Sequence, residues 1–447
     1  MACLIGMAKA DLEPALQPCQ PVSEERVCAV ALYAEQGALR TLWVVLDMMD
    51  FDLHVVSTLK GAVSARLGLP ESHVHILSTH NHGGGEPDAE RLAPLIADCA
   101  WKAAQTAVPA RMRYAITQVP RQVTLIRRMY VPEIESTTTV FYGITEQTRF
   151  DSAPHTEYVL QKLNEGTYPY IGTTETDRPF IPYPPGDPQI AAVAFESLEG
   201  KLIGSIVRFA THVVCSNRPG IFTGDFPHHL RQKMEEALGG TAMYLSGPCG
   251  NICPGMERKN DGTSKKLGTL LADTALKALD KANFAPIKAL KETAVTISLP
   301  VRKEVLENAV EIPDQMPEDL PARRIYLEQQ GTLSRMDFLQ EKYRKGEVCP
   351  KETTDISFGL LQLNDLVFAA FPGETFYETG EALRHAFPET AIVTVTEHGR
   401  SVMYLPPHDQ LAQGGYETVC RMTACGAAEK LETETVSAVK HFLNFEK

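Results

Sequence analysis

A His-x-His motif is the feature of this sequence best suited to metal chemistry. His80 and His82 follow a short apolar run, and three glycines come directly after them. Alternate residues on an extended backbone share one face, so both imidazoles can reach the same site. Glycines also let a substrate or another backbone segment come close. Taken alone, the motif fits a metal site and an ordinary polar loop equally well.

Further polar side chains follow apolar segments or lie in loops. His212 comes after the apolar residues 206–210, and Glu374 lies in a Pro-Gly-Glu turn after another apolar run. Tyr404 and Tyr416 lie in loops rich in proline and glycine. Each has an ordinary explanation, as a hydrogen-bonded core histidine, a surface carboxylate or packing tyrosines. None of them identifies a site by itself.

Residues 246–255, with the sequence SGPCGNICPG, are dense in glycine and proline and directly follow a predicted strand. Ordering such a segment is costly in conformational entropy, which favours a shaped site over a simple turn. A plain turn remains the alternative. His228 and His229 lie in the first turn of a predicted helix and are interpreted as surface or packing residues.

The pattern of strands and helices that must position these side chains indicates an α/β fold of mixed sheets with flanking helices. Ligand sites in such folds gather at the carboxyl ends of strands, where His80 stands. The periodicity and the turn residues predict the following strands and helices. Strands are expected at 42–47, 74–78, 112–119, 190–195, 202–211 and 242–246, and helices at 53–67, 88–108, 226–238 and 264–282.

Three segments are expected to surround this core. Residues 124–188 are rich in Thr, Tyr, Pro and Gly and are expected to form loops and short strands beside a cleft. Residues 304–347 are strongly charged and predict a helical surface insertion. The core resumes at 356–371, and 429–445 predicts a closing helix. Since no linker is evident, residues 1–447 are expected to form one large domain.

Composition narrows the class of protein. The formal net charge is −13, which argues against nucleic-acid partners and against a stable anchor on an anionic membrane. The N-terminus lacks the pattern of a signal peptide, and no apolar run reaches the ~20 residues that span a bilayer. The ten cysteines are scattered and are expected to be reduced thiols. A cytoplasmic, bacterial-type enzyme is the expectation.

Taken together and in order, the motifs resemble the catalytic domain of the neutral, non-lysosomal ceramidase family. The opening GMAKADLEP at 6–14 is similar to the family's G-x-A-K-x-D-I-T-P, and STHNH at 78–82 to its T-H-T-H-S-G. FATH at 209–212, the loop at 250–254, PGE at 372–374 and the segment 404–417 resemble later family motifs. The resemblance covers almost the whole chain.

The resemblance implies a zinc site and a reaction. In the family, zinc is bound by the first His of H-x-H, the His of F-x-x-H, the Glu of P-G-E and a Tyr. Here this implies Zn²⁺ bound by His80, His212, Glu374 and Tyr404. The metal would activate water, and the substrate would be an N-acyl compound with a linear amide.

The resemblance also implies roles for three further residues. His82 is expected to act as general acid or base, and Tyr416 to donate a hydrogen bond to the tetrahedral oxyanion. Arg127, with Arg128 as the alternative, is expected to orient the substrate carbonyl.

Three departures from the family pattern bear on the substrate. Cys253 and Asn251 replace the family's Ser and Asp, and Val213 replaces a Pro. A nucleophilic Cys253 is disfavoured, because metal-activated water makes it unnecessary. The expected signal peptide and C-terminal immunoglobulin-like domain are not evident either. A small soluble N-acyl substrate is therefore expected instead of ceramide.

Alternative functions stay open at this point. An ester or lactone could be hydrolysed at the same zinc site, since both pass through a tetrahedral oxyanion. A metal-binding homologue without turnover is a second alternative, and a protein-interaction module a weaker third. A metallo-β-lactamase is disfavoured, because its H-x-H-x-D-H motif would need Asp and His at Gly84 and Gly85. The oligomeric state is not predicted.

Overall fold

The computed structural model describes residues 1–16, 21–120, 123–139, 153–166, 186–216, 220–255, 262–307, 309–345 and 352–444. Much of the expected wall at 124–188 lies outside these ranges, as does the end of the expected insertion. The last residue of the predicted closing helix also lies outside the described residues.

The largest element is a mixed sheet with the strand order β11-β10-β9-β5-β1-β2-β3-β4, in which β13 also pairs with β5. β3 pairs in parallel with β4, and β10 with β11, whereas the other pairs are antiparallel. β1 and β5 share a short register, so the sheet consists of two halves. Its strands are β1 (Leu4–Asp11), β2 (Cys28–Gln36), β3 (Leu39–Leu46), β4 (Val74–Ser78), β5 (Val108–Gln118), β9 (Gln189–Ser197), β10 (Leu202–Phe209), β11 (Thr241–Ser246) and β13 (Ala285–Pro286).

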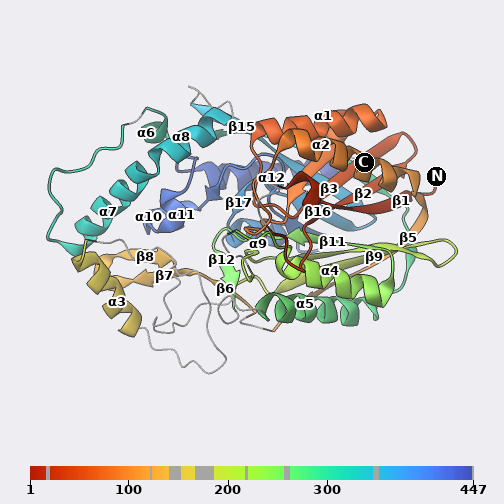
Figure 1. The fold of residues 1–447 in the computed structure, drawn as a ribbon, viewed down its shortest axis with the longest axis horizontal. Coiled ribbons are helices and arrows are strands. Elements are labelled where there is room, and N and C mark those ends of the chain that lie inside the picture. The colour runs from red at the N-terminus through yellow and green to blue at the C-terminus, as the bar shows by residue number, and fades with distance from the viewer. Residues whose placement is uncertain are drawn as a thin grey trace.

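Four helices cover the outer face of this sheet (Figure 1). α1 (Leu53–Leu67) and α2 (Ala89–Gln105) pack on the β1–β4 half, and α4 (Asp225–Leu238) and α5 (Thr263–Leu279) on the other half. The ends of α1 are set locally: the Asp52 side chain accepts a hydrogen bond from the backbone N–H of Val55, and Gly68 closes the helix at φ 62°. The predicted bounds of α1 and β4 are confirmed.

A second, four-stranded sheet packs against the inner face of the first. Apolar side chains of both sheets, among them Trp43, Phe195 and Phe368, form one buried core between them. Helices α9 (Tyr377–Ala386) and α12 (Ala427–Asn444) cover its outer face. The molecule is thus layered helix–sheet–sheet–helix, which confirms the expected α/β class. The strands, in sheet order, are β14 (Leu290–Pro300), β15 (Thr353–Leu363), β16 (Leu366–Ala370) and β18 (Ala391–Val395).

The segment expected to be a helical insertion contains three helices in its described residues, and they are more than a solvated face. Leu327 and Leu339 of its helices are buried in a separate apolar cluster that also contains Tyr404. These helices lie at the end of the molecule opposite the two termini (Figure 1). The elements at this end are β7 (Arg128–Val131), β8 (Ser136–Thr139), α3 (Ala153–Asn164), α6 (Lys303–Leu306), α7 (Leu320–Ser334), α8 (Met336–Lys345), α10 (His408–Ala412) and α11 (Tyr416–Val419).

The carboxyl ends of several strands meet between the layers. The Ser246 hydroxyl at the end of β11 donates a hydrogen bond to the carbonyl of Thr79 just after β4, at 2.6 Å. The N–H of Thr396, just after β18, donates to the carbonyl of Ser246 at 2.8 Å. Two short sheets complete this region: β12 (Ile252–Pro254) pairs with β6 (Thr124–Ile126), and β17 (Glu374–Thr375) with β19 (Tyr404–Leu405).

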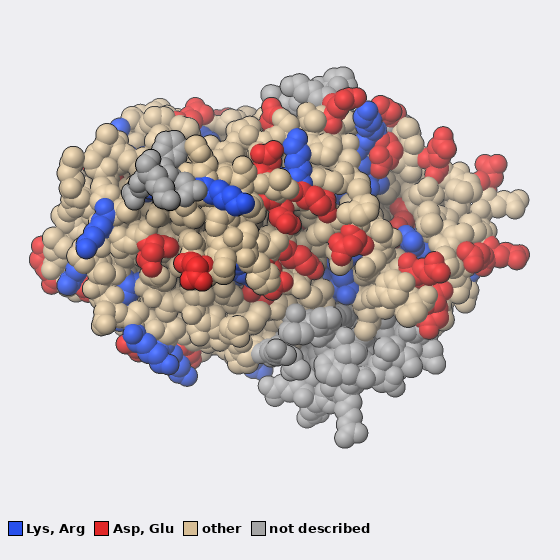
Figure 2. All heavy atoms as spheres, turned by 180° about the vertical axis from the view of Figure 1, so that it is seen from behind, with Lys and Arg blue, Asp and Glu red and all other residues tan. Residues whose placement is uncertain are grey.

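The surface agrees with the acidic composition. On the face shown in Figure 2, acidic and basic side chains are interspersed, and the basic ones form no continuous patch. Among the helices of the described residues, none is both long and apolar enough to cross a bilayer.

Candidate metal centre

The His80–His82 loop is held by tight backbone packing. His80 has a left-handed backbone, with φ 59°. Its ring Nδ1 donates a hydrogen bond to the carbonyl of Met49 at 3.1 Å and lies 3.4 Å from a carboxylate oxygen of Glu397. A Cβ at Gly84 would lie 1.9 Å from the carbonyl oxygen of Asp47, so only glycine allows this approach. The loop thus presents Nε2 of His80 to the interior.

His212 is oriented in the same way from the other half of the sheet. Its Nδ1 donates to the carbonyl of Ile252 at 2.8 Å, which fixes the tautomer and leaves the lone pair on Nε2. The next residue, Val213, pairs with Asn81, and its carbonyl accepts from the N–H of His82 at 3.2 Å. The loops after β4 and β10 are therefore joined directly beside the histidines.

Glu374 and Tyr404 come from the short β17–β19 sheet. They are direct partners in its parallel register, so neighbouring strands bring the carboxylate and the phenol together. Their chain separation is large, and this sheet is what joins them. Both side chains are buried.

Three imidazoles and a carboxylate converge on one point. His80 Nε2 and His212 Nε2 lie 3.3 and 3.2 Å from the same oxygen of Glu374, and His82 Nε2 lies 3.3 Å from His80 Nε2. Potential ligand atoms of the three histidines all lie within 4.8 Å of one another. Ligands held at roughly 2.0–2.1 Å by a tetrahedral ion stand about 3.4 Å apart, so a transition-metal ion fits this arrangement.

The electrostatics of the cluster favour a positive charge at its centre. Burial lowers the pKa of His80, but Glu374 and Glu397 outweigh it and raise that pKa to about 9. Burial raises the pKa of Glu374, and His80 and His212 lower it well below its ordinary value. Burial and Arg127 lower the pKa of His212 to about 4. Anionic Glu374 and the neutral imidazole of His212 are the forms that bind a metal.

Arg127 is buried directly beside the centre. Its guanidinium donates to Tyr404 Oη at 3.0 Å and to the carbonyl of Gly250 at 2.9 Å, and lies 3.1 Å from His212 Nε2. Its backbone N–H donates to the carbonyl of Asn251 at 2.9 Å. These contacts show which role the glycine-rich loop at 246–255 has: its successive carbonyls, including that of Ile252, orient side chains of the site.

Tyr416 lies against Tyr404, with ring centroids 5.7 Å apart and an interplanar angle of 72°. The structure therefore brings together every residue that the sequence assigned to the site. Glu397 and Glu417, which were not predicted, also contact it. Glu397 follows β18, and its position after a strand was the available sign for it. Glu417 directly follows Tyr416 in the segment 404–417 that resembles a family motif, and that resemblance was the available sign for it.

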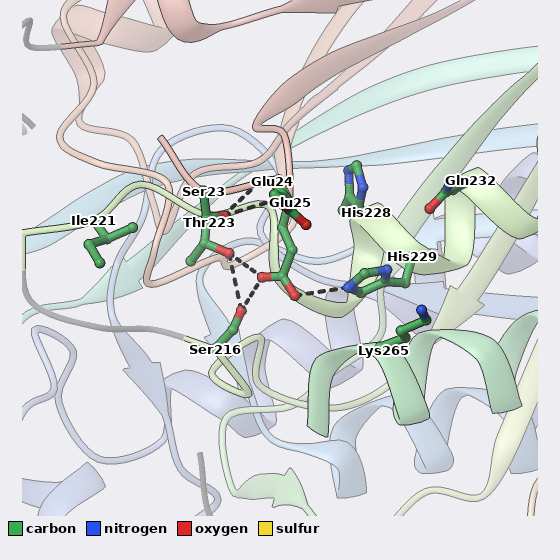
Figure 3. Close-up of a pocket in the computed structure, with 10 residues that line it drawn as sticks. All are labelled: Ser23, Glu24, Glu25, Ser216, Ile221, Thr223, His228, His229, Gln232 and Lys265. Atoms are coloured by element: carbon green, nitrogen blue, oxygen red, sulfur yellow. Dashed lines mark hydrogen bonds and ion pairs between the residues drawn. The ribbon is translucent and has the colours of Figure 1, made fainter. Parts of the chain in front are cut away.

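A second polar cluster, centred on Glu25, is hydrogen-bonded to the histidine loop through Thr223. Glu25 accepts hydrogen bonds from Ser216, Thr223 and His229 at one side of a pocket of about 620 Å³ (Figure 3). The Ser264 hydroxyl donates to the same carboxylate. The backbone of Thr223 in turn bonds to Gly83 and to the Asn81 side chain. Burial by itself raises the pKa of Glu25. The hydrogen bonds that its carboxylate accepts, of which that from His229 has the largest effect, outweigh burial and lower the pKa to about 2. His229 is thus a partner of Glu25, consistent with the packing role expected for it.

Cys253 is buried in β12, where it pairs with β6. Burial raises the pKa of its thiol to about 12, although Arg127 opposes the effect. A protonated thiol is a poor nucleophile.

Comparison with known proteins identifies the fold. No family model and no curated protein matches the sequence. The structure of neutral ceramidase from Pseudomonas aeruginosa matches with a TM-score of 0.64 at 13% identity, over 98% of this chain and 74% of that chain. A structure described as a ceramidase complexed with C2 matches with a TM-score of 0.65 at 15% identity, over 99% of this chain and 76% of that chain. The chain therefore has the fold of neutral ceramidase, as the sequence motifs indicated.

Proposed function

We propose that this chain is a zinc-dependent hydrolase that cleaves a linear amide bond of an N-acyl compound. The observation that carries the proposal is the convergence of His80, His212 and Glu374 on one point, with Tyr404 beside Glu374, in a chain with the fold of a ceramidase. Two imidazoles, a carboxylate and a phenolic oxygen suit Zn²⁺ and leave a position for water. Zinc bound there would supply an acidified water and polarise the carbonyl.

The protein side chains would then direct the substrate and the protons. His82 is close enough to the centre, with Nε2 3.3 Å from His80 Nε2, to take a proton from the attacking water and pass it to the leaving amine. Tyr416, with its ring against that of Tyr404, would donate to the oxyanion. An amine leaves poorly without a proton, so a positioned acid favours an amide substrate over an ester.

The test is amine release from a panel of N-acyl compounds, from short polar amides to a short-chain ceramide, with and without chelator. Chelator-sensitive release supports the proposal, and the compounds that react identify the substrate as polar or lipid-like. No amine release by the zinc-loaded protein, together with cleavage of matched esters, would replace the amidase with an esterase. Glu374→Ala should abolish both zinc binding and turnover, and unchanged zinc content in that variant would refute the ligand assignment.

A further inference from the structure

Glu417 forms the centre of a buried ionic network next to the metal centre. Its carboxylate is fully buried and lies between two arginines. Arg127 Nε donates to one oxygen at 2.9 Å, and Arg128 Nη1 donates to the other at 2.7 Å. The Thr139 hydroxyl donates to that second oxygen at 2.8 Å. The carboxylate is therefore held from three directions and has a fixed orientation.

This orientation is transmitted to the metal centre through Arg127. The guanidinium is planar and rigid, so fixing Nε also fixes the edge that carries Nη1 and Nη2. On that edge, Nη1 lies 3.1 Å from His212 Nε2, the atom that would bind zinc, and Nη2 donates to Tyr404 Oη at 3.0 Å. Glu417 itself touches neither ligand in any contact described above. The hydrogen bonds from Glu417 towards these ligands therefore run through Arg127.

The charge of Arg127 also affects the metal centre. Arg127 is buried, and a buried cation needs a partner to offset its desolvation. Arg128 has further acceptors in the carbonyls of Gln410 and Gly414, both at 2.8 Å. Without Glu417, Arg127 would lose the carboxylate that accepts from its Nε at 2.9 Å, and its positive charge would repel a dication at the centre more strongly.

We propose that Glu417 is a positioning residue for the metal centre: it orients Arg127 towards His212 and Tyr404 and neutralises its charge there. The inference rests on the proposed zinc site. It assigns to Glu417 a role in zinc affinity that a merely structural residue would not have. It also explains why a carboxylate directly follows Tyr416, since α11 then places both side chains at the site.

The test is a double-mutant cycle on zinc affinity, measured by chelator competition without substrate. Glu417→Gln keeps the shape but removes the charge, and is expected to weaken zinc binding by about tenfold or more. Arg127→Met combined with Glu417→Gln removes both charges, and its affinity should return to within about threefold of Arg127→Met alone. Thr139→Val, which removes one hydrogen bond to Glu417 but no charge, should weaken zinc binding less than Glu417→Gln does. Equal affinity of Glu417→Gln and wild type, or additive losses in the double variant, would overturn the proposal.

A second measurement keeps the inference separate from the zinc hypothesis. Arg127→Ala leaves a cavity that methylguanidinium should fill, raising the melting temperature of that variant in the metal-free protein. The rise should vanish in Arg127→Ala/Glu417→Gln, because the carboxylate that orients the guanidinium is gone. A rise of the same size in both variants would refute the positioning role. If the wild type bound no zinc, the proposed function would fail, while this comparison would still decide whether Glu417 orients Arg127.

Discussion

The position of His82 is compatible with two roles, a zinc ligand and a general acid or base. Its Nε2 lies 3.3 Å from His80 Nε2, which is within the spacing of ligands around one ion. The resemblance to ceramidases gives the fourth ligand position to Tyr404 instead. Tyr404 is the direct neighbour of Glu374 across β17–β19, and its phenol accepts a hydrogen bond from a cationic donor, Arg127. These contacts favour Tyr404 as the ligand.

Two substitutions separate these roles. His82→Ala is expected to retain stoichiometric zinc and to lower kcat by about 10²–10⁴, because a proton-transferring group is lost. Tyr404→Phe removes the phenolic oxygen but keeps the ring, and is expected to weaken zinc binding about 10–100-fold. Metal content after dialysis against a weak chelator measures zinc binding in both variants. The kcat of zinc-loaded His82→Ala measures the loss of proton transfer. Zinc loss from His82→Ala with full retention in Tyr404→Phe would reverse the assignment.

Cys253 is expected to be dispensable for the chemistry. Its thiol is buried and its pKa is raised to about 12, so thiolate is scarce at neutral pH. Cys253→Ser should keep kcat/KM within about threefold of the wild type, since the hydroxyl occupies nearly the same space. Incubation of the wild type with iodoacetamide should leave its activity unchanged. A covalent acyl-enzyme on Cys253 would contradict the metal-activated water mechanism.

At the scale of elements, the sequence predicts best where the determinants are local. α1 and β4 have the predicted bounds because an Asp cap, a C-terminal glycine and an apolar run define them without help from distant residues. β14 was not predicted. Its residues are mostly half-buried, and its strand conformation depends on pairing with β15, in which Leu290 faces Leu363. Such pairing between distant segments leaves little trace in the strand's own sequence.

A buried hydrogen-bond chain between the two sheets leads to a pH prediction. The carbonyl of Ser357 accepts from His398 Nδ1 at 3.0 Å, so neutral His398 can only accept at Nε2, from His75 Nδ1 at 2.9 Å. Neutral His75 must then accept at its own Nε2, and the partner there is Glu292 at 2.9 Å. The chain is complete only if the carboxyl of Glu292 carries a proton. Burial lowers the pKa of His75 to about 3, which agrees with a neutral ring.

Glu292→Gln should therefore be tolerated, because the amide can donate to His75 as the protonated acid does. Burial raises the pKa of Glu292 from 4.5 to about 7, while His73 and Lys60 lower it less. Because the carboxyl holds its proton more tightly in the folded protein, its contribution to stability is complete below the pKa of the unfolded chain. That contribution is lost as the pH rises to the pKa of the folded protein. Relative to Glu292→Gln, the wild type should lose roughly 3 kcal/mol of stability between pH 4.5 and 7 and no more above. Urea unfolding across this range measures the difference.

The matched control is Glu292→Ala, which provides no donor to His75 and should be destabilised at every pH in this range. If the pair were instead a carboxylate with a cationic His75, Glu292→Gln would be much less stable than the wild type at pH 5 as well. That outcome would show that the proton resides on the histidine.

At the scale of the whole molecule, the proposed metal adds a further link between elements that already meet through packing and hydrogen bonds. His80 and His212 follow strands in the two halves of the large sheet, Glu374 follows β16 of the second sheet, and Tyr404 is buried in the apolar cluster of the helical end. His80, His212 and Glu374 each follow an apolar run, and the ordered resemblance to the family motifs singled out these three residues and Tyr404. Their meeting point was not predictable, because it depends on how two sheets pack face to face.

Metal removal should consequently destabilise the whole chain and not one part of it. Zinc at about a thousand times its dissociation constant stabilises the folded state by roughly 4 kcal/mol, which for a chain of this length corresponds to about 4 °C in Tm. We expect one calorimetric transition that moves as a unit when zinc is stripped and restored, as one domain over residues 1–447 requires. His80→Ala should show the lower Tm with and without zinc. Two transitions, of which zinc moves only one, would mean that the helical end or the second sheet unfolds independently, and the single-domain expectation would be wrong.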